Sequence, residues 1–175
     1  MSENATPPRS RAERRRDTEH RLAHDVDLWV ASASADGAPY LVPLSFDWDG
    51  EDLLAATLAD SPTGRNLTAN GTVRLALGGT RDVTMIDGDV EVLALDALPR
   101  KRGDRFAART GFDPRRSDTA SGNASDNGSG NGSGNASAAS PYRWFRITPR
   151  RVQAWREADE IQGRELMRDG HWLTD

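Results

Sequence analysis

Apolar and polar residues alternate along most of the chain, which is the pattern of β-strands with one buried face. The clearest run places Tyr40, Val42, Leu44, Phe46 and Trp48 on one face at a spacing of two residues. The other strands that this pattern predicts cover residues 26–33, 53–58, 73–77, 83–95, 142–147 and 151–156. Hairpin-type Asp-Gly pairs follow the first two strands and leave no room for the helical crossovers that parallel strands need. The pattern therefore predicts a mainly β protein, a six- to seven-stranded antiparallel barrel.

Three further segments predict helices at the margin of this barrel, over residues 10–24, 61–70 and 98–110. Ser10 and Glu13 have the spacing of a capping box at the start of the first helix. Ser61 is a suitable N-cap for the second, because a proline follows it at the first helical position. A glycine follows both the second and the third helix, which suits a left-handed stop. The helices are expected to be peripheral to the sheet.

Residues 117–140 differ in composition from the rest of the chain. Ser, Gly, Asn and Ala make up 21 of these 24 residues, so the segment has too few apolar groups to offset its ordering entropy. We interpret it as a disordered insertion. Residues 1–9 are expected to form a disordered arm, and residues 10–175 a single barrel domain that carries the insertion.

Composition narrows the classes of function. The formal net charge of −4 argues against general binding to nucleic acids or membrane surfaces, and no apolar run reaches the length of a membrane span. The chain has no cysteine, which fits a reducing compartment, and we expect a cytoplasmic protein. His20 and His24 have a spacing that can bind zinc, but His171 is the only other histidine and lies far along the chain, so no metal site is expected.

The segment from Thr57 to Leu67 carries the most informative chemistry. A strand ends there, and a helix opens with Ser61, Thr63 and Arg65 in its first turn. The amides and the positive dipole end of a helix attract phosphate, hydroxyls can donate to it, and arginine can pair with it bidentately. From these residues alone, the segment could also be an ordinary capped helix with an exposed arginine.

At this segment the chain resembles the pyridoxamine 5'-phosphate oxidase-like family of flavin-binding split β-barrels. Four motifs match in order. Residues 33–44 resemble that family's first hairpin, and residues 61–70 resemble its phosphate-binding turn of the type S-x-K-x-x-x-L-x-x-N. Residues 81–88 resemble its strand–glycine–strand element, and residues 149–155 its C-terminal P-x-x-[IV]-E-x-W element.

The resemblance implies a split barrel that binds FMN, or alternatively the deazaflavin coenzyme F-420, at a homodimer interface. The cofactor-binding residues that it implies are Leu41, Val42, Pro43, Leu44, Thr57, Ser61, Thr63, Arg65, Asp82 and Trp155. The first four would offer backbone groups to the isoalloxazine edge, and Thr57 would contact the phosphate or the ribityl chain. Ser61, Thr63 and Arg65 would hold the phosphate. Asp82 or Val83 would lie near the ring, and Trp155 would cover the cofactor from the partner subunit.

Three departures from the family pattern bear on the activity. Thr63 stands where the family usually has a phosphate-binding lysine, Gln153 replaces a glutamate, and the segment Arg164 to Arg168 lacks the histidine of an R-x-H-x-R substrate motif. These departures argue against oxidation of pyridoxamine phosphate itself. The resemblance instead implies hydride transfer between a flavin or deazaflavin and an unidentified small molecule. The alternative is a non-catalytic module that stores or senses a flavin, a deazaflavin or haem. We identify no catalytic acid or base.

Overall fold

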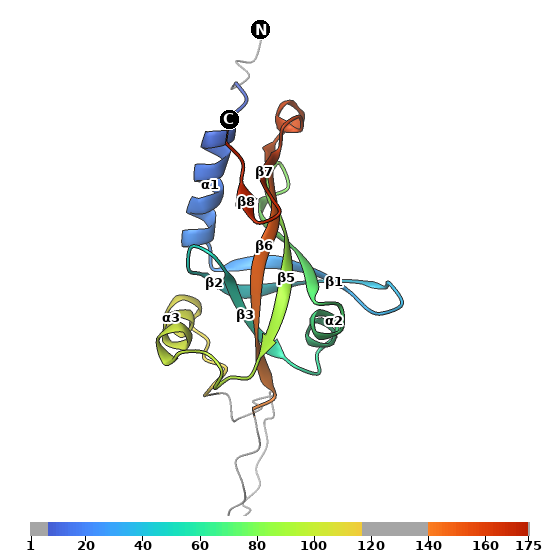
Figure 1. Cartoon of the computed structure of the whole chain (residues 1–175), viewed down its shortest axis with the longest axis vertical. Coiled ribbons are helices and arrows are strands. Elements are labelled where there is room, and N and C mark those ends of the chain that lie inside the picture. The colour runs from blue at the N-terminus through green and yellow to red at the C-terminus, as the bar shows by residue number, and fades with distance from the viewer. Residues whose placement is uncertain (1–6, 117–139, 175) are drawn as a thin grey trace, which may run out of the picture.

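The computed structural model describes residues 7–116 and 140–174, and one antiparallel sheet forms its centre (Figure 1). Its strands are β1 (Asp27–Ala33), β2 (Pro39–Trp48), β3 (Leu53–Leu58), β4 (Thr72–Gly79), β5 (Asp82–Leu93), β6 (Tyr142–Arg156), β7 (Glu165–Arg168) and β8 (His171–Trp172). The order is β3-β2-β1-β4-β5-β6-β7-β8, and β3 also pairs with β6. That last pairing closes six strands into a barrel, which confirms the predicted fold class.

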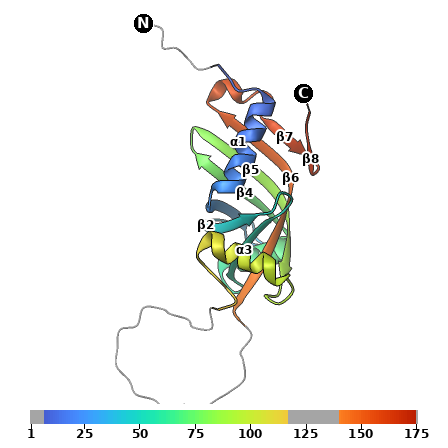
Figure 2. The same ribbon diagram turned by 90° about the vertical axis from the view of Figure 1, so that its left-hand side faces the viewer.

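Three helices flank the sheet: α1 (Arg11–His24), α2 (Pro62–Asn70) and α3 (Arg100–Thr110). Figure 2 shows α1 and α3 on the same side of the sheet, while α2 lies on the opposite side in Figure 1. The side chain of Leu67 on α2 is fully buried in the main core. Phe106 on α3 packs against the ring of Trp144 in a second core, with ring centroids 5.0 Å apart. Helix α3 begins two residues later than predicted, because Pro99 occupies the N-cap.

The sequence pattern wrongly divided β6 into two strands at Pro149. Pro149 pairs with Gly88 at an irregularity between Asp87 and Gly88, and the strand continues through it. Along β6, the pairing with β3 ends at Ile147 and the pairing with β7 begins at Val152. No second strand therefore requires an N–H at Pro149, so the proline costs the sheet no hydrogen bond on that side.

The short strands β7 and β8 were not predicted, so the sheet has eight strands rather than six or seven. With four and two residues, they are too short for an alternating pattern to emerge. They extend the sheet beyond the barrel, and α1 packs against this extension.

The capping box of α1 is present as predicted, with the Glu13 N–H donating to the Ser10 side chain. Arg9, which we had assigned to a disordered arm, is fixed in the structure. Its backbone N–H and its guanidinium both donate to Glu160, at 2.8 Å each. Residues 1–6 of the predicted arm lie outside the described residues, as does the predicted insertion apart from Ser140. No helix in the described part of the chain is long and apolar enough to cross a membrane.

Candidate functional site

The connection from β3 to α2 is a tight turn built around Ser61. The Ser61 hydroxyl accepts the Gly64 N–H at 3.0 Å and donates to the Leu58 carbonyl at 2.8 Å. A Cβ added at Gly64 would lie 2.2 Å from that same carbonyl oxygen, so the helix approaches the strand end closely only because residue 64 is glycine. Ser61 therefore shapes this turn, and its hydroxyl proton is already used within the chain.

Arg65 is the accessible cation of the turn. Its guanidinium folds back onto the Asp60 carbonyl at the start of α2 while the residue remains exposed. Thr63, in contrast, is only 3 % exposed, so an incoming anion cannot readily reach its hydroxyl in this conformation. The three residues of the predicted phosphate site are thus adjacent, but they differ in what they can offer. Arg65 is the one that presents donors to solvent.

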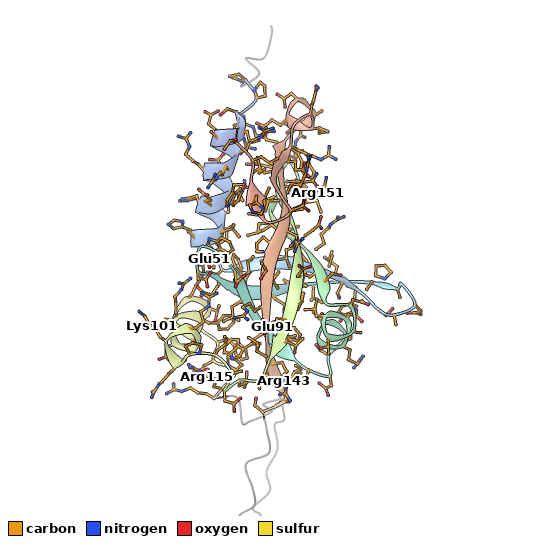
Figure 3. The ribbon with its side chains drawn as sticks, viewed as in Figure 1. Glu51, Glu91, Lys101, Arg115, Arg143 and Arg151 are labelled. Carbon is orange, nitrogen blue, oxygen red and sulfur yellow. The ribbon has the colours of Figure 1, made fainter. Side chains whose placement is uncertain are left out.

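Two neighbours extend this region. Thr57 lies 3.5 Å from the Ser61 hydroxyl, oxygen to oxygen, and pairs across the sheet with Arg143 on β6. The Ala59 N–H donates to the Pro141 carbonyl at 2.9 Å, which holds the start of β6 beside the turn. Figure 3 shows Arg143 at this lower end of the molecule, where it donates to the Ser140 carbonyl at 2.9 Å. Arg143 is therefore a second cation near the start of α2.

The predicted ring-binding strand borders a recess. A cavity of about 330 Å³ lies between β2, β3 and α3. Its lining residues are Asp27, Pro43, Leu44, Ser45, Ala56, Phe106 and Phe112. Two of the four predicted residues of β2 thus line a concave site, while Leu41 is 60 % exposed further along the strand. The sequence did not single out Phe106 or Phe112, because an apolar position on a helix or loop does not reveal which surface it covers.

Asp82 and Trp155 lie in a different part of the molecule. Val83, next to Asp82, pairs with Trp155, so the two predicted residues are close to each other at one end of β5. Towards the other end of β5, the Val90 N–H donates to the Gly71 carbonyl at the end of α2. Eight residues of extended strand separate these points by about 26 Å. Within one chain, the fold does not bring Asp82 and Trp155 to the start of α2.

The carboxylate of Asp82 is engaged in ion pairs. It accepts from Arg9 at 2.8 Å and from Arg21 at 2.6 Å. A contact between Asp82 and a cofactor remains a prediction, and it would compete with these pairs. The guanidinium of Arg164 lies over the Trp155 ring, 5.7 Å from the ring centroid.

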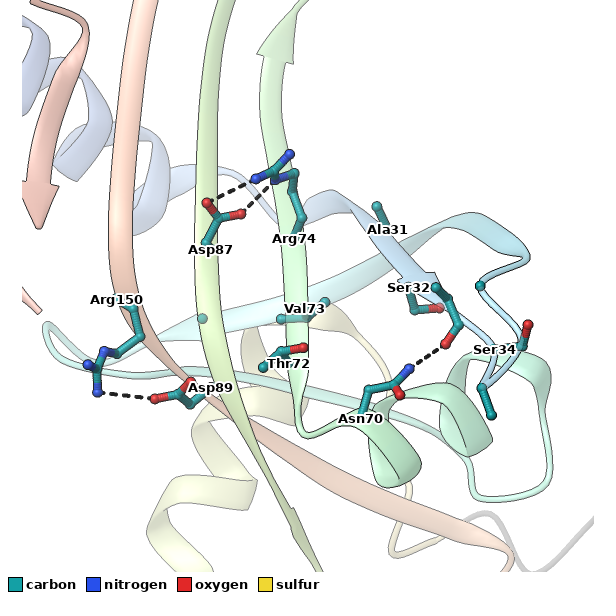
Figure 4. Close-up of a pocket in the computed structure, with 14 residues that line it drawn as sticks. Ala31, Ser32, Ser34, Asn70, Thr72, Val73, Arg74, Asp87, Asp89 and Arg150 are labelled. Atoms are coloured by element: carbon teal, nitrogen blue, oxygen red, sulfur yellow. Dashed lines mark hydrogen bonds and ion pairs between the residues drawn. The ribbon is translucent and has the colours of Figure 1, made fainter. Parts of the chain in front are cut away.

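A groove of about 810 Å³ lies on the sheet between the end of β1, β4 and β5, and Figure 4 shows its lining. Arg74 donates to both oxygens of Asp87, at 2.6 and 3.1 Å, and Arg150 pairs with Asp89 at 3.3 Å. Both arginines of the groove are thus neutralised. None of the ten predicted site residues lines this groove. Across residues 7–116 and 140–174, no three His, Asp or Glu side chains gather in a way that could hold a metal ion.

Comparison with known proteins places this barrel in a family. The family model described as pyridoxamine 5'-phosphate oxidase matches residues 22–156. The chain belongs to this family. The matched segment contains all ten predicted site residues and every strand of the closed barrel. No curated protein sequence matches the chain.

Several solved structures share the fold at low sequence identity. An F420 reductase is 18 % identical with a TM-score of 0.51, over 77 % of this chain and 94 % of that one. A putative pyridoxamine 5'-phosphate oxidase from Listeria innocua is 14 % identical with a TM-score of 0.51, over 79 % and 95 %. A general stress protein 26-related protein from Clostridium acetobutylicum is 13 % identical with a TM-score of 0.55, over 85 % and 92 %.

Proposed function

We propose that this protein binds FMN or a deazaflavin and transfers hydride between that cofactor and a small molecule. The observation that carries the proposal is the family match over residues 22–156, which includes the barrel and the start of α2. The fold likeness to an F420 reductase is the reason to keep a deazaflavin beside FMN. The cofactor supplies the redox chemistry when bound, and the protein binds it, orients it and excludes water.

Each part of the cofactor has a candidate partner in this chain. Arg65 would pair with the phosphate, helped by Arg143, while Ser61 and Gly64 keep the turn in shape. Thr63, which is buried, would support that turn rather than contact the phosphate. Pro43 and Leu44 would offer backbone groups to the ring at the recess whose other wall is Phe106 and Phe112. A dry apolar wall would favour hydride transfer by keeping water from the reacting atoms.

A second copy of the chain would complete the site. Proteins of this family are commonly dimeric. Asp82 and Trp155 lie far from the start of α2 in their own chain, so a partner subunit is the means by which Trp155 could reach a cofactor bound there. We therefore propose two equivalent sites per homodimer.

The second candidate function is a non-catalytic flavin, deazaflavin or haem module. Leu166 favours it: this residue stands at the histidine position of the R-x-H-x-R motif and is 0 % exposed, packed in the main core. The position therefore has neither a proton to give nor access to a substrate. The two candidates differ in whether the reduced cofactor is reoxidised by an acceptor in repeated turnovers.

Arg65 provides the direct test of the phosphate assignment. Replacing it with alanine should weaken cofactor binding by about 1.5–3 kcal/mol, the value of a charge-assisted hydrogen bond. That is roughly a 10- to 150-fold increase in dissociation constant, measured by fluorescence titration of FMN and of the deazaflavin. Arg65→Lys should recover part of the affinity, because it keeps the charge but loses the planar fork.

Arg100→Ala is the matched control. Arg100 is also an exposed arginine in the first turn of a helix, with its side chain 92 % exposed, and it should bind cofactor as the wild type does. If the wild type binds neither cofactor, the proposed function fails. If Arg65→Ala binds as tightly as the wild type, only the phosphate assignment fails, and Arg143→Ala becomes the next variant to measure.

A further inference from the structure

A third concave site lies at the opposite end of the barrel from α2, and its chemistry is unlike that of the proposed flavin site. A cavity of about 560 Å³ is enclosed by the β2–β3 turn, the middle of β6 and the β7–β8 turn. Trp48 and Trp172 contribute two indole rings to its wall, and Met167 adds a polarisable thioether. Glu51, Asp52 and Asp169 contribute carboxylates. None of these residues belongs to the proposed flavin site.

The two turns that form the wall are fixed to the same part of β6. The Thr148 hydroxyl donates to the Asp52 carboxylate at 2.6 Å, which anchors the β2–β3 turn. The Gly170 N–H donates to the Arg150 carbonyl at 2.9 Å, which anchors the β7–β8 turn. Pro149 lies between these two anchors and is buried. The cavity is therefore preformed, and a ligand would not have to order its walls.

The charge of the wall is negative. The carboxylates of Glu51 and Asp169 have no hydrogen-bond or ion-pair partner among the described residues, and both residues are exposed. Arg150 is the only cation of the lining, and it pairs with Asp89 outside the cavity. Arg168, the neighbour of Asp169, pairs with Glu165. Among the described residues, a bound cation would thus meet two carboxylates, those of Glu51 and Asp169, that form no ion pair.

The ring of Trp172 already has a cation stacked on it. The guanidinium of Arg15 on α1 lies 4.7 Å from the ring centroid, although Arg15 does not line the cavity. Indole faces attract cations through the ring quadrupole, and two indoles with free carboxylates are the combination that recognises organic ammonium groups. Inorganic cations would find no cluster of three metal ligands in the described residues.

We propose that this cavity binds a small organic cation, an alkylated or quaternary ammonium group, between Trp48 and Trp172 with Glu51 and Asp169 as counter-charges. This site is separate from the proposed flavin site and does not depend on it. The alternative is that the cavity binds a neutral, purely apolar ligand, and the experiment must distinguish these two kinds of ligand.

The probe is choline, compared with its uncharged carbon isostere 3,3-dimethylbutan-1-ol. The readout is the indole N–H resonances of the five tryptophans by nuclear magnetic resonance at constant ionic strength, assigned by Trp48→Phe and Trp172→Phe. Choline should shift the Trp48 and Trp172 resonances saturably at concentrations up to about 100 mM, and the isostere should not. The other three tryptophans should remain unchanged.

The double variant Glu51→Gln with Asp169→Asn tests the counter-charges. Asparagine suits position 169, where φ is 50°, because it tolerates the left-handed region. The choline dissociation constant should rise roughly 3- to 30-fold, as expected for cation–π and exposed ionic contacts. The control, Glu91→Gln with Asp96→Asn, removes two charges elsewhere and should leave it unchanged. Equal binding of the isostere, no shift at Trp48 and Trp172, or equal affinity of the two double variants would each overturn the proposal.

Discussion

At the scale of single residues, Glu160 joins segments that are far apart in the sequence. It follows β6 in the 3-10 helix η1 (Ala158–Glu160), and its side chain is 0 % exposed. Its carboxylate accepts from the backbone and side chain of Arg9, and from the Arg156 N–H at 2.6 Å. Arg9 in turn pairs with Asp82 on β5. The residue therefore fixes the segment before α1 against the extension of the sheet.

Stability should depend on pH through Glu160. Burial alone would raise its pKa, but the hydrogen bonds from Arg9 and Arg156 outweigh that effect and lower the pKa from 4.5 to about 2. A lowered folded-state pKa contributes stability above pH 4.5 that is lost as the pH falls towards 2, about 3 kcal/mol in all. The difference in unfolding free energy between wild type and Glu160→Gln should therefore shrink over this range. Urea titrations at each pH measure it.

Glu91→Gln is the control for that series. Glu91 pairs with Arg146 on the surface, where an ion pair contributes little, so its variant should follow the wild type at every pH. A wild-type advantage over Glu160→Gln that stays constant from pH 5 to pH 2 would contradict the assignment of the low pKa to Glu160.

At the scale of elements, Gly64 decides how closely α2 packs on the end of β3. Alanine normally stabilises a helix relative to glycine by up to about 1 kcal/mol. At position 64 the new Cβ would meet backbone oxygens at 2.2 and 2.8 Å, which cannot move without displacing the strand end. Gly64→Ala should instead lower the unfolding free energy by about 1–3 kcal/mol, measured by thermal or urea denaturation.

Gly103→Ala on α3 is the matched comparison. The nearest atoms to its Cβ would belong to the guanidinium end of Arg115, at 2.6 Å, which is the far end of a flexible side chain and not backbone, although a shift would have to preserve its ion pairs with Asp104 and Asp113. This variant should leave the unfolding free energy unchanged or raise it slightly, because alanine has a higher helix propensity than glycine. Similar destabilisation of both variants would show that the close approach of residue 64 to the Leu58 carbonyl is not the cause of the lost stability.

Local signals account for the elements that the sequence could predict. The capping box at Ser10, the Ser61 cap and the alternating run of β2 each involve residues within a few positions of one another, and each is confirmed. Arg9 and Glu160 are 151 positions apart, so no local pattern could link them. Strand β6 can continue through Pro149 because its pairing with β3 ends before this residue and its pairing with β7 begins after it. That arrangement is a property of the whole sheet, which a local sequence pattern does not contain.

The candidate site was predictable to a similar extent. The motif at residues 61–70 correctly indicated a helix that starts with Ser61 as N-cap. The sequence could not show that Thr63 is buried or that the Ser61 hydroxyl donates to the Leu58 carbonyl, because both follow from how α2 packs on the barrel. The Phe106 and Phe112 wall of the recess depends on the position of α3 in the same way.

At the scale of the whole molecule, one face of the sheet carries apolar side chains that remain exposed in the described part of the chain. Trp29 on β1 is 48 % exposed and pairs with Pro43 on β2 and Ala76 on β4. Leu41, on the same side, is 60 % exposed. Residues of neighbouring strands that pair directly have side chains on the same face, so these groups form one patch. A monomer would leave this patch in water, and we expect it to be the interface of the proposed homodimer.

Trp29→Glu should therefore separate the dimer. A charge at the centre of an interface of about 800 Å² per subunit would have to be buried without a partner, while the exposed position allows the monomer to fold normally. Light scattering at micromolar concentration should report a dimer for the wild type and a 19.1 kDa monomer for the variant. The matched control is Ile161→Glu, at an apolar residue that is 44 % exposed next to η1, and it should remain dimeric.

Because the proposed cofactor site needs Trp155 of a second copy, Trp29→Glu should also lose cofactor affinity although it changes none of the proposed contacts. A wild type that is monomeric, or a Trp29→Glu dimer as stable as the wild type, would exclude this face as the interface.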